Sequence, residues 1–394
     1  MTPSLFREEA ASKSPYLYNV AAVLLLIAFV LVRYNQILQN FWLGDDPKIL
    51  QHAISYRPWE YFFLPDAWRD LSVINFTPWI TFTYNLDLII FGLDPFGFYL
   101  HQLVSLSILA IVSYVVLRLW FPLTFSLFGV LLFVSSPPFA ESAHFLMFRH
   151  YFEGMIFALL SVYFFSRNLE KNKQALTVVS SSFYLLSCLA NPIYVPLLFF
   201  LALLPGGGWR DRLRNILPFV CVAFLYAIWR WVMLGMLFGG YGVELTWPSD
   251  AKLFFSRVIN AMGIGLGEKQ LSWWKWVVVV DFLAVLLLLY RIEKKSRMVT
   301  FLEITTVSAA ILLPIVPVSP IMEPRYVMLP LFLWLVLHLI AWKKIRTHIA
   351  RPSVQTAFLF WSSVVITFFL VASSSNNEKL KLYEKRQKKR EFFS

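Results

Sequence analysis

Long apolar runs recur along almost the whole chain of 394 residues. A helix needs about 20 apolar residues to cross a hydrocarbon core of about 30 Å. Of the residues, 58% are hydrophobic and only 15% are charged, whereas soluble domains carry about 25% charged residues. The sequence therefore predicts an all-α polytopic membrane protein. We expect one multi-span transmembrane domain over residues 1–372 and a basic C-terminal tail over residues 373–394.

The apolar runs predict about 11 transmembrane helices. Single spans are expected at residues 17–33, 97–119, 123–135, 145–165, 214–236, 273–290, 301–319, 326–342 and 353–372. One helix over residues 175–204 would be about 45 Å long, which exceeds the thickness of the core. Asn191-Pro192 also interrupts this run, because proline removes a donor and clashes with the preceding turn. We expect two short, tilted spans there, with a turn at residues 190–192.

Basic residues gather in short loops, and such loops stay on the cytoplasmic side. With the N-terminus inside, loops 166–174, 205–213 and 291–300 are cytoplasmic. Reading residues 175–204 as one span would put the later basic loops outside. The count of spans leaves the basic tail 373–394 outside, which conflicts with the same rule. The net charge of +12 is thus attributed to membrane orientation and not to nucleic-acid binding.

Successive loops alternate between the two sides of the membrane, and this order assigns four segments to the outer side. They are residues 34–94, 136–144, 237–272 and 320–325. The long first outer loop is rich in Trp, Tyr and Pro, a composition that favours short helices lying in the interface. Polar residues suited to chemistry are concentrated in these outer segments.

Two adjacent acids, Asp45 and Asp46, directly follow the first span. A charge at bilayer depth costs about 2.5–3.5 kcal/mol on insertion scales, so acids close to a span call for a reason. An ionised carboxylate within reach of a hydroxyl can act as a general base. The alternative is a helix-capping or interfacial pair.

A second group of polar residues surrounds the start of the span at 145–165. Glu141, His144, Arg149 and His150 follow one another there, and we expect them on one broad side of a helix. Each has a structural alternative. Glu141 would favour a helix N-terminus, Arg149 would form an ion pair with Glu141, and the histidines would be hydrogen-bonded packing residues.

Arg325 and Tyr326 lie at the head of a late span, directly after Glu323-Pro324. Arginine suits a phosphate because its planar fork donates two hydrogen bonds and stays charged. Snorkelling to the membrane surface is the alternative for this residue.

Five motifs, taken in order, resemble the GT-C superfamily of polyprenyl-phosphate-sugar glycosyltransferases. The resemblance is to the branch with the protein O-mannosyltransferases and the membrane region of the tetratricopeptide O-mannosyltransferases, over about residues 17–342. The motifs are FWLGDD, FGLDPFGFYLHQL, SSPPFAESAHFLMFRHY, LLSCLANPIYVPLL and EPRYVMLP. The resemblance implies a GT-C-like helical bundle and an inverting transfer of sugar from a polyprenyl-phosphate donor to an acceptor hydroxyl on the non-cytoplasmic side.

The resemblance also implies roles for individual residues. Asp45 is the base that acts on the acceptor and Asp46 supports it, or the reverse. Glu141 and Arg149 match the acid and the arginine of the second outer loop, and Arg325 would hold the lipid phosphate. His144, His150 and Tyr326 join these as candidate substrate-binding residues.

The chain departs from the family pattern at two places. Phe76-Thr77-Pro78 stands where the family has Arg-Pro, and Gln102 stands near the position of the family's Asn. Tetratricopeptide repeats are absent, so sugar and acceptor stay open between protein, lipid and glycan. Family members differ on metal dependence, which leaves a divalent cation open. The implied location is the inner membrane in a bacterium or the endoplasmic reticulum membrane in a eukaryote.

A transporter or flippase for a lipid-linked or small polar substrate is the alternative function. Such a protein predicts charges at the midplane of the bilayer and inverted repeats. Here the candidate acids gather on one side of the membrane and no repeat is visible, which favours the enzyme.

Overall fold

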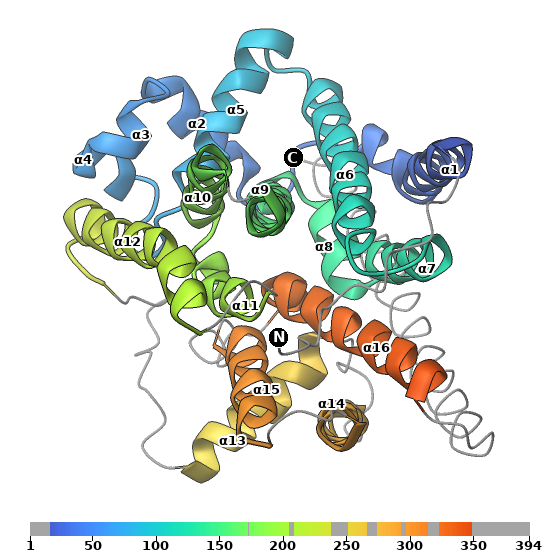
Figure 1. Ribbon diagram of the computed structural model, residues 1–394. Coiled ribbons are helices and arrows are strands. Elements are labelled where there is room, and N and C mark those ends of the chain that lie inside the picture. The colour runs from blue at the N-terminus through green and yellow to red at the C-terminus, as the bar shows by residue number, and fades with distance from the viewer. Residues whose placement is uncertain are drawn as a thin grey trace.

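Every regular element that the structure describes is a helix (Figure 1). The computed structural model describes residues 16–171, 173–204, 209–237, 251–265, 274–292, 297–313 and 323–348. The prediction of an all-helical chain is confirmed within these ranges. The expected span at 353–372 and the basic tail lie outside them.

The long helices include several that can cross a membrane. Over the described ranges, four meet the requirements of length and apolar composition: Tyr16–Gln39, Pro95–Leu117, Leu213–Leu234 and Pro324–Ile345. A fifth is added if α7 and α8, bent by 54°, form one broken span. These helices support a membrane protein, while the count of about 11 spans stays a prediction.

The first half of the chain contributes the following elements. They are α1 (Tyr16–Tyr34), η1 (Asn35–Gln39), α2 (Asp46–Ser55), α3 (Glu60–Phe63), α4 (Pro65–Arg69), α5 (Pro78–Phe91), α6 (Pro95–Leu117), α7 (Leu123–Val134), α8 (Pro137–His144), η2 (Leu146–Phe148) and α9 (Arg149–Lys171). The second half contributes α10 (Gln174–Ala190), η3 (Pro192–Tyr194), α11 (Leu197–Leu203), α12 (Trp209–Leu234), α13 (Ala251–Gly265), α14 (Trp274–Ile292), α15 (Arg297–Leu312), η5 (Pro324–Val327) and α16 (Met328–His348).

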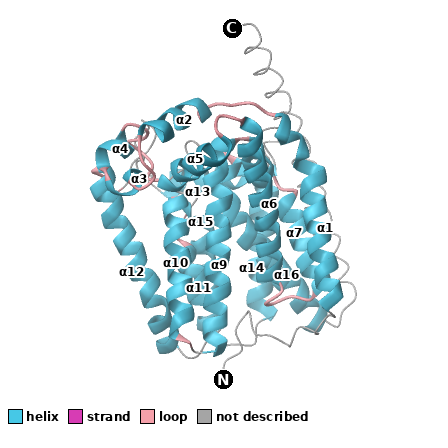
Figure 2. Cartoon of the chain, turned by 90° about the horizontal axis from the view of Figure 1, so that it is seen from above, coloured by secondary structure: helices cyan, strands magenta, loops and turns pink. Residues whose placement is uncertain are grey.

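The predicted first outer loop is a chain of short helices, α2 to α5. They lie at one end of the bundle, from which α9, α10 and α12 extend (Figure 2). The other predicted outer segments meet at η5, because both α8 and α13 pack against it. Segment 136–144, expected as a loop, is helix α8, and all of its residues are buried.

The break predicted at residues 190–192 is present. α10 ends at Ala190, and the Asn191 side chain accepts a hydrogen bond from the Ile193 amide at 3.1 Å. The Tyr194 hydroxyl donates to the Tyr151 carbonyl at the start of α9. Further on, the Phe200 ring lies 6.1 Å from the ring of Trp120, which follows the end of α6. The chain therefore reverses between α10 and α11, and α11 packs chiefly against α12 and α15.

The expectation of one continuous helix from Glu141 into the next span is wrong. α8 ends at His144, Phe145 is extended with φ −120° and ψ 124°, and α9 begins only at Arg149. The Gln102 amide donates to the carbonyl of Ala143 at 2.8 Å and to that of Ser142 at 3.3 Å. These carbonyls would bond to the next turn in a continuing helix, so Gln102 completes the end of α8.

Candidate functional site

The two adjacent acids have opposite surroundings. Asp46 begins α2 and is buried, and its carboxylate accepts hydrogen bonds from the Leu43 amide and the Tyr84 hydroxyl, each at 2.8 Å. Asp45 is exposed at the N-cap of α2, where its side chain makes no capping hydrogen bond. Asp45 is thus the solvent-accessible acid of the pair, and Asp46 fixes the loop that carries it.

Burial raises the pKa of Asp46 from its usual value to about 6. The hydrogen bonds from Leu43 and Tyr84 act in the opposite direction, because they favour the charged form. Removal from water outweighs them. The Asp46 carboxyl consequently titrates near neutral pH.

This pKa predicts how stability depends on pH. The folded protein binds the Asp46 proton more tightly than the unfolded chain, so the contribution to stability is complete below about pH 4 and is lost as pH rises through about 6. Two pKa units correspond to about 3 kcal/mol. Asp46→Asn can accept from Leu43 and donate to Tyr84, so thermal melting should lose this component of the pH dependence and otherwise be preserved.

Asp46→Ala is the contrasting variant. It leaves the Leu43 amide and the Tyr84 hydroxyl without their acceptor, at about 1–3 kcal/mol for each buried group. The melting temperature should then fall at every pH. Equal melting curves for the alanine and asparagine variants would contradict the role of Asp46 as the anchor of this loop.

The loop before α2 packs directly against η2. Gly44 has φ +60°, a conformation that favours glycine, and a Cβ added there would lie 3.0 Å from the Met147 side chain. The Asp45 amide donates to the Met147 sulfur at 3.3 Å. The position of Asp45 is therefore set by the contact between its loop and Met147.

Arg325 forms an ion pair with Glu141. Its Nη1 donates to Glu141 Oε1 at 2.8 Å, and its backbone amide donates to Glu141 Oε2 at 2.9 Å. The guanidinium carbon lies 4.0 Å from the centre of the Phe148 ring and 4.9 Å from that of Tyr326. The Arg325 side chain is 16% exposed, so one edge of the group reaches solvent.

One short element, η2, brings these two sites together. Met147 contacts the backbone of Asp45, and the next residue, Phe148, lies under the guanidinium of Arg325. The backbone of Asp45 and the guanidinium of Arg325 therefore lie against the same turn of chain. The sequence assigned these residues to three different segments, and the structure gathers them.

The remaining candidates, His144, His150 and Tyr326, contact aromatic rings. His144 is buried with its ring edge-on to that of Tyr34 at 6.2 Å, and the His150 ring lies 4.4 Å from that of Tyr151. Tyr326 is buried, and its ring is 5.7 Å from the same Tyr151. These contacts agree with the packing alternative for the two histidines.

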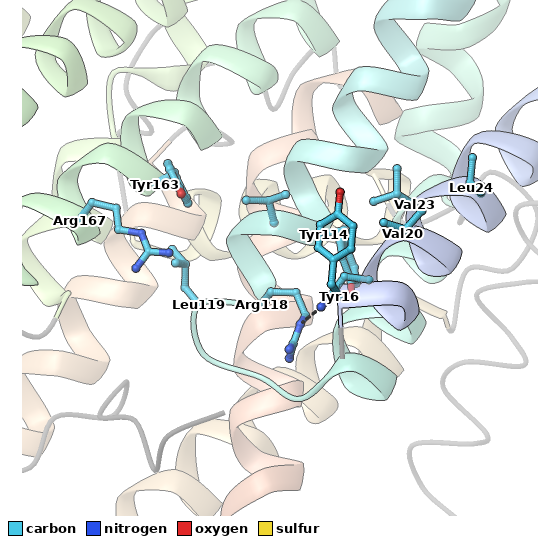
Figure 3. Close-up of a pocket in the computed structure, with 11 residues that line it drawn as sticks. Tyr16, Val20, Val23, Leu24, Tyr114, Arg118, Leu119, Tyr163 and Arg167 are labelled. Carbon is cyan, nitrogen blue, oxygen red and sulfur yellow. Dashed lines mark hydrogen bonds between the residues drawn. The ribbon is translucent and has the colours of Figure 1, made fainter. Parts of the chain in front are cut away.

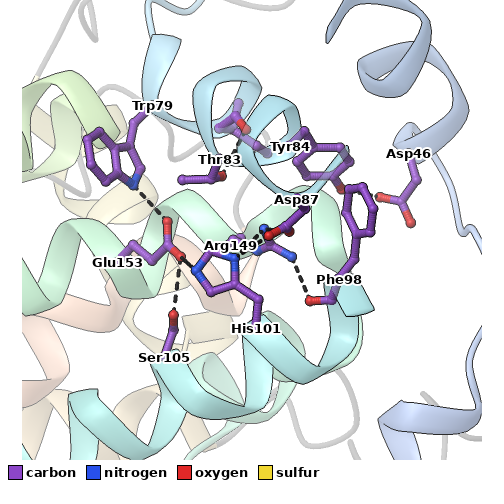
Figure 4. Close-up of polar contacts among 11 residues, drawn as sticks. Asp46, Trp79, Thr83, Tyr84, Asp87, Phe98, His101, Ser105, Arg149 and Glu153 are labelled. Atoms are coloured by element: carbon purple, nitrogen blue, oxygen red, sulfur yellow. Dashed lines mark hydrogen bonds and ion pairs between the residues drawn. The ribbon is translucent and has the colours of Figure 1, made fainter. Parts of the chain in front are cut away.

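Arg149 lies inside the bundle and does not pair with Glu141. Its guanidinium is fully buried, forms an ion pair with Asp87 and donates to the Phe98 carbonyl at 2.7 Å (Figure 4). The ring of His101 is within 3.2 Å of Arg149 Nη1 and 2.7 Å of Asp87. The carboxylate neutralises the arginine, as a buried charge requires.

Glu153 extends this buried group along α9. Its carboxylate accepts from the Trp79 indole at 2.7 Å and from Ser105 at 3.3 Å, and it lies 3.5 Å from His101 (Figure 4). At the other end, the Arg149 guanidinium lies 5.4 Å from the centre of the Tyr84 ring, whose hydroxyl donates to Asp46. The buried cluster thus joins α5, α6 and α9 to the loop of the two acids.

Sequence reasoning missed Asp87 and Glu153. Each is a single carboxylate within an apolar stretch, NLDLII and YFEGMIF. An acid in such a stretch is expected to pair inside the bundle, and this signal pointed to them. The sequence analysis considered Glu141, eight positions before Arg149, as the partner of this arginine instead.

Over the residues that the structure describes, no group of three or more His, Cys, Asp or Glu is placed to hold a metal ion. No family model matches this sequence, and no curated protein matches it either.

Proposed function

We propose that the protein is a membrane glycosyltransferase with a GT-C-like bundle, which moves a sugar from a polyprenyl-phosphate donor to an acceptor hydroxyl with inversion. The observation that carries this proposal is the contact of both Asp45 and Arg325 with η2. A base for the acceptor and a cation for the phosphate are the two groups that this reaction needs. The motif resemblance supports the same assignment.

In the proposed mechanism Asp45 takes the proton from the acceptor hydroxyl. The resulting oxygen attacks the anomeric carbon from the face opposite to the leaving group. The bond between that carbon and the phosphate oxygen breaks, and polyprenyl phosphate leaves with the electron pair. One displacement of this kind inverts the anomeric carbon, and Arg325 stabilises the negative charge on the phosphate.

Glu141 and Arg149 have supporting roles in this mechanism. One of the five N–H groups of the Arg325 guanidinium donates to Glu141. The phosphate would therefore share this guanidinium with the Glu141 carboxylate. Arg149 is buried and engaged by Asp87, and we assign it to holding α9 and not to substrate. Asp46 positions Asp45 through the turn before α2.

A direct test uses the purified protein with a set of polyprenyl-phosphate sugars. Release of polyprenyl phosphate that depends on an added acceptor is the expected result. A donor that is consumed without acceptor, or no consumption of any donor by a folded protein, would argue against the proposal.

Arg325→Lys tests the phosphate contact. Lysine keeps the charge and can still pair with Glu141, but it lacks the planar fork. Loss of a charged hydrogen bond of about 1.5–3 kcal/mol should weaken donor binding by about 10–100-fold. The apparent KM for the donor should rise while that for the acceptor stays unchanged. An unchanged donor KM in a folded variant would remove Arg325 from the phosphate site.

A transporter is the second candidate, because one acid and histidine pair lies deep between two long helices. Asp281 in α14 is buried, and the His338 ring in α16 lies 3.0 Å from its carboxylate. Ionisable groups inside a membrane bundle often mark ion pathways. Uptake into vesicles that is lost in Asp281→Asn, without sugar transfer by the wild type, would favour this candidate.

A further inference from the structure

An open cavity of about 430 Å³ lies between α1, α6 and α9. It is formed by the start of α1, the end of α6 and the later part of α9 (Figure 3). The acids follow the end of α1, so this cavity is at the opposite end of the bundle. It is also the end at which the basic loop 166–174 begins.

Two arginines lie at the rim of this cavity. Arg118 is held by hydrogen bonds from Nε to Asn19 at 3.4 Å and from Nη1 to the Phe121 carbonyl at 2.6 Å. Arg167 comes from α9, with its guanidinium 5.3 Å from the centre of the Tyr163 ring (Figure 3), and its Nη1 donates to Glu170 at 2.8 Å, which leaves its other N–H groups for a ligand. Guanidinium groups placed on both sides of an opening suit a phosphate, which can accept from several N–H groups at once.

The facing wall of the cavity is apolar. Val20, Val23 and Leu24 line it from α1, and Leu24 is 61% exposed. This apolar surface continues along α1 toward the middle of the span. An acyl chain can bury apolar surface against this wall, whereas a soluble phosphate has no apolar surface to bury there. Tyrosines at the opening, Tyr16 and Tyr114 among them, are typical of the depth of lipid headgroups.

We propose that this cavity binds an anionic membrane phospholipid, with the phosphate between Arg118 and Arg167 and an acyl chain along α1. Charge complementarity identifies the occupant, because basic pockets between spans attract anionic headgroups and the cytoplasmic leaflet is rich in them. This site is independent of sugar transfer and of the acids at the other end.

Native mass spectrometry of the detergent-purified protein tests the proposal. Phosphatidylglycerol, phosphatidylcholine with the same acyl chains, and glycerol phosphate are added separately. One tightly retained phosphatidylglycerol is expected, with weaker retention of phosphatidylcholine and none of glycerol phosphate. Equal binding of the two lipids, or retention of glycerol phosphate, would overturn the proposal.

Matched variants locate the site. Arg167 is part-exposed, so Arg167→Gln preserves the fold, and loss of one charge near the membrane surface, about 1 kcal/mol, should weaken phosphatidylglycerol binding about fivefold. Lys173→Gln removes an exposed charge nearby but outside the cavity and should leave binding unchanged. Val20→Glu places a carboxylate beside the arginines and should abolish retention. Equal effects of the glutamine variants, or full binding by Val20→Glu, would overturn the assignment.

Discussion

Asp45→Asn is expected to lower the rate of sugar transfer by about 10²–10⁴-fold, the usual contribution of a general base. The amide keeps the size of the side chain but cannot take the acceptor proton. The fold should be preserved, because the Asp45 side chain makes no capping hydrogen bond. Donor binding should also be preserved, since the proposed phosphate contact is made by Arg325. The measurement is kcat with the donor KM determined in parallel.

Two control variants make this result specific. Asp66→Asn changes another exposed acid of the same long loop, in the first turn of α4, and should leave turnover unchanged. Asp46→Asn should lower turnover less than Asp45→Asn, because Asp46 acts by holding the loop. Full transfer activity in both the Asp45 and Asp46 variants would mean that the base lies elsewhere.

Arg149→Gln is expected to cause the largest loss of stability. Removal of one member of a buried ion pair typically costs about 3–5 kcal/mol, because the remaining charge is left without a partner. Here two carboxylates depend on the guanidinium, Asp87 directly and Glu153 through its charge. The variant should give little folded protein, or melt far below the wild type in detergent.

A second substitution separates charge from packing in this cluster. Asp87→Asn made together with Arg149→Gln removes both charges and should recover a large part of the lost stability. Arg167→Gln, at a part-exposed pair with Glu170, should change stability by at most about 1 kcal/mol. If Arg149→Gln melts like the wild type, the buried pair does not hold α9 in place.

The described chain has a helix break at Asn191-Pro192 and another at Phe145, and only the first could be predicted from the sequence. Asn191-Pro192 ends α10 through a local rule, because proline excludes the preceding helical turn wherever it occurs. The break at Phe145 has no such local signal. It is accompanied by hydrogen bonds from the side chain of Gln102, about 40 positions earlier in the sequence, to the last carbonyls of α8. Neither periodicity nor composition reports a partner at that separation.

The sequence also did not show which charged residues form ion pairs, because these pairs join residues far apart in the chain. Expecting the acids, Glu141 and Arg325 at one end of the bundle needed only the predicted order of spans and the basic loops. Which arginine meets which acid depends on how the helices pack. The Glu141 partner is Arg325, 184 positions later, and Arg149 meets Asp87, 62 positions earlier. The sequence also could not show which of the two adjacent acids is accessible, because Asp45 and Asp46 are the same residue type and differ only in their burial.

The three residues of η2 are held at both ends, and this restricts the substrate geometry of the proposed enzyme. Gln102 secures the chain before η2, and the buried Arg149 secures it immediately after. Met147 contacts the backbone of Asp45, and the next side chain, Phe148, lies against the guanidinium of Arg325. In the proposed enzyme, the size of these two side chains would set the distance between the base and the phosphate site. Substitutions at these two positions can change which substrates fit while the reactive groups stay the same, whereas inserting one residue would put the two groups out of register.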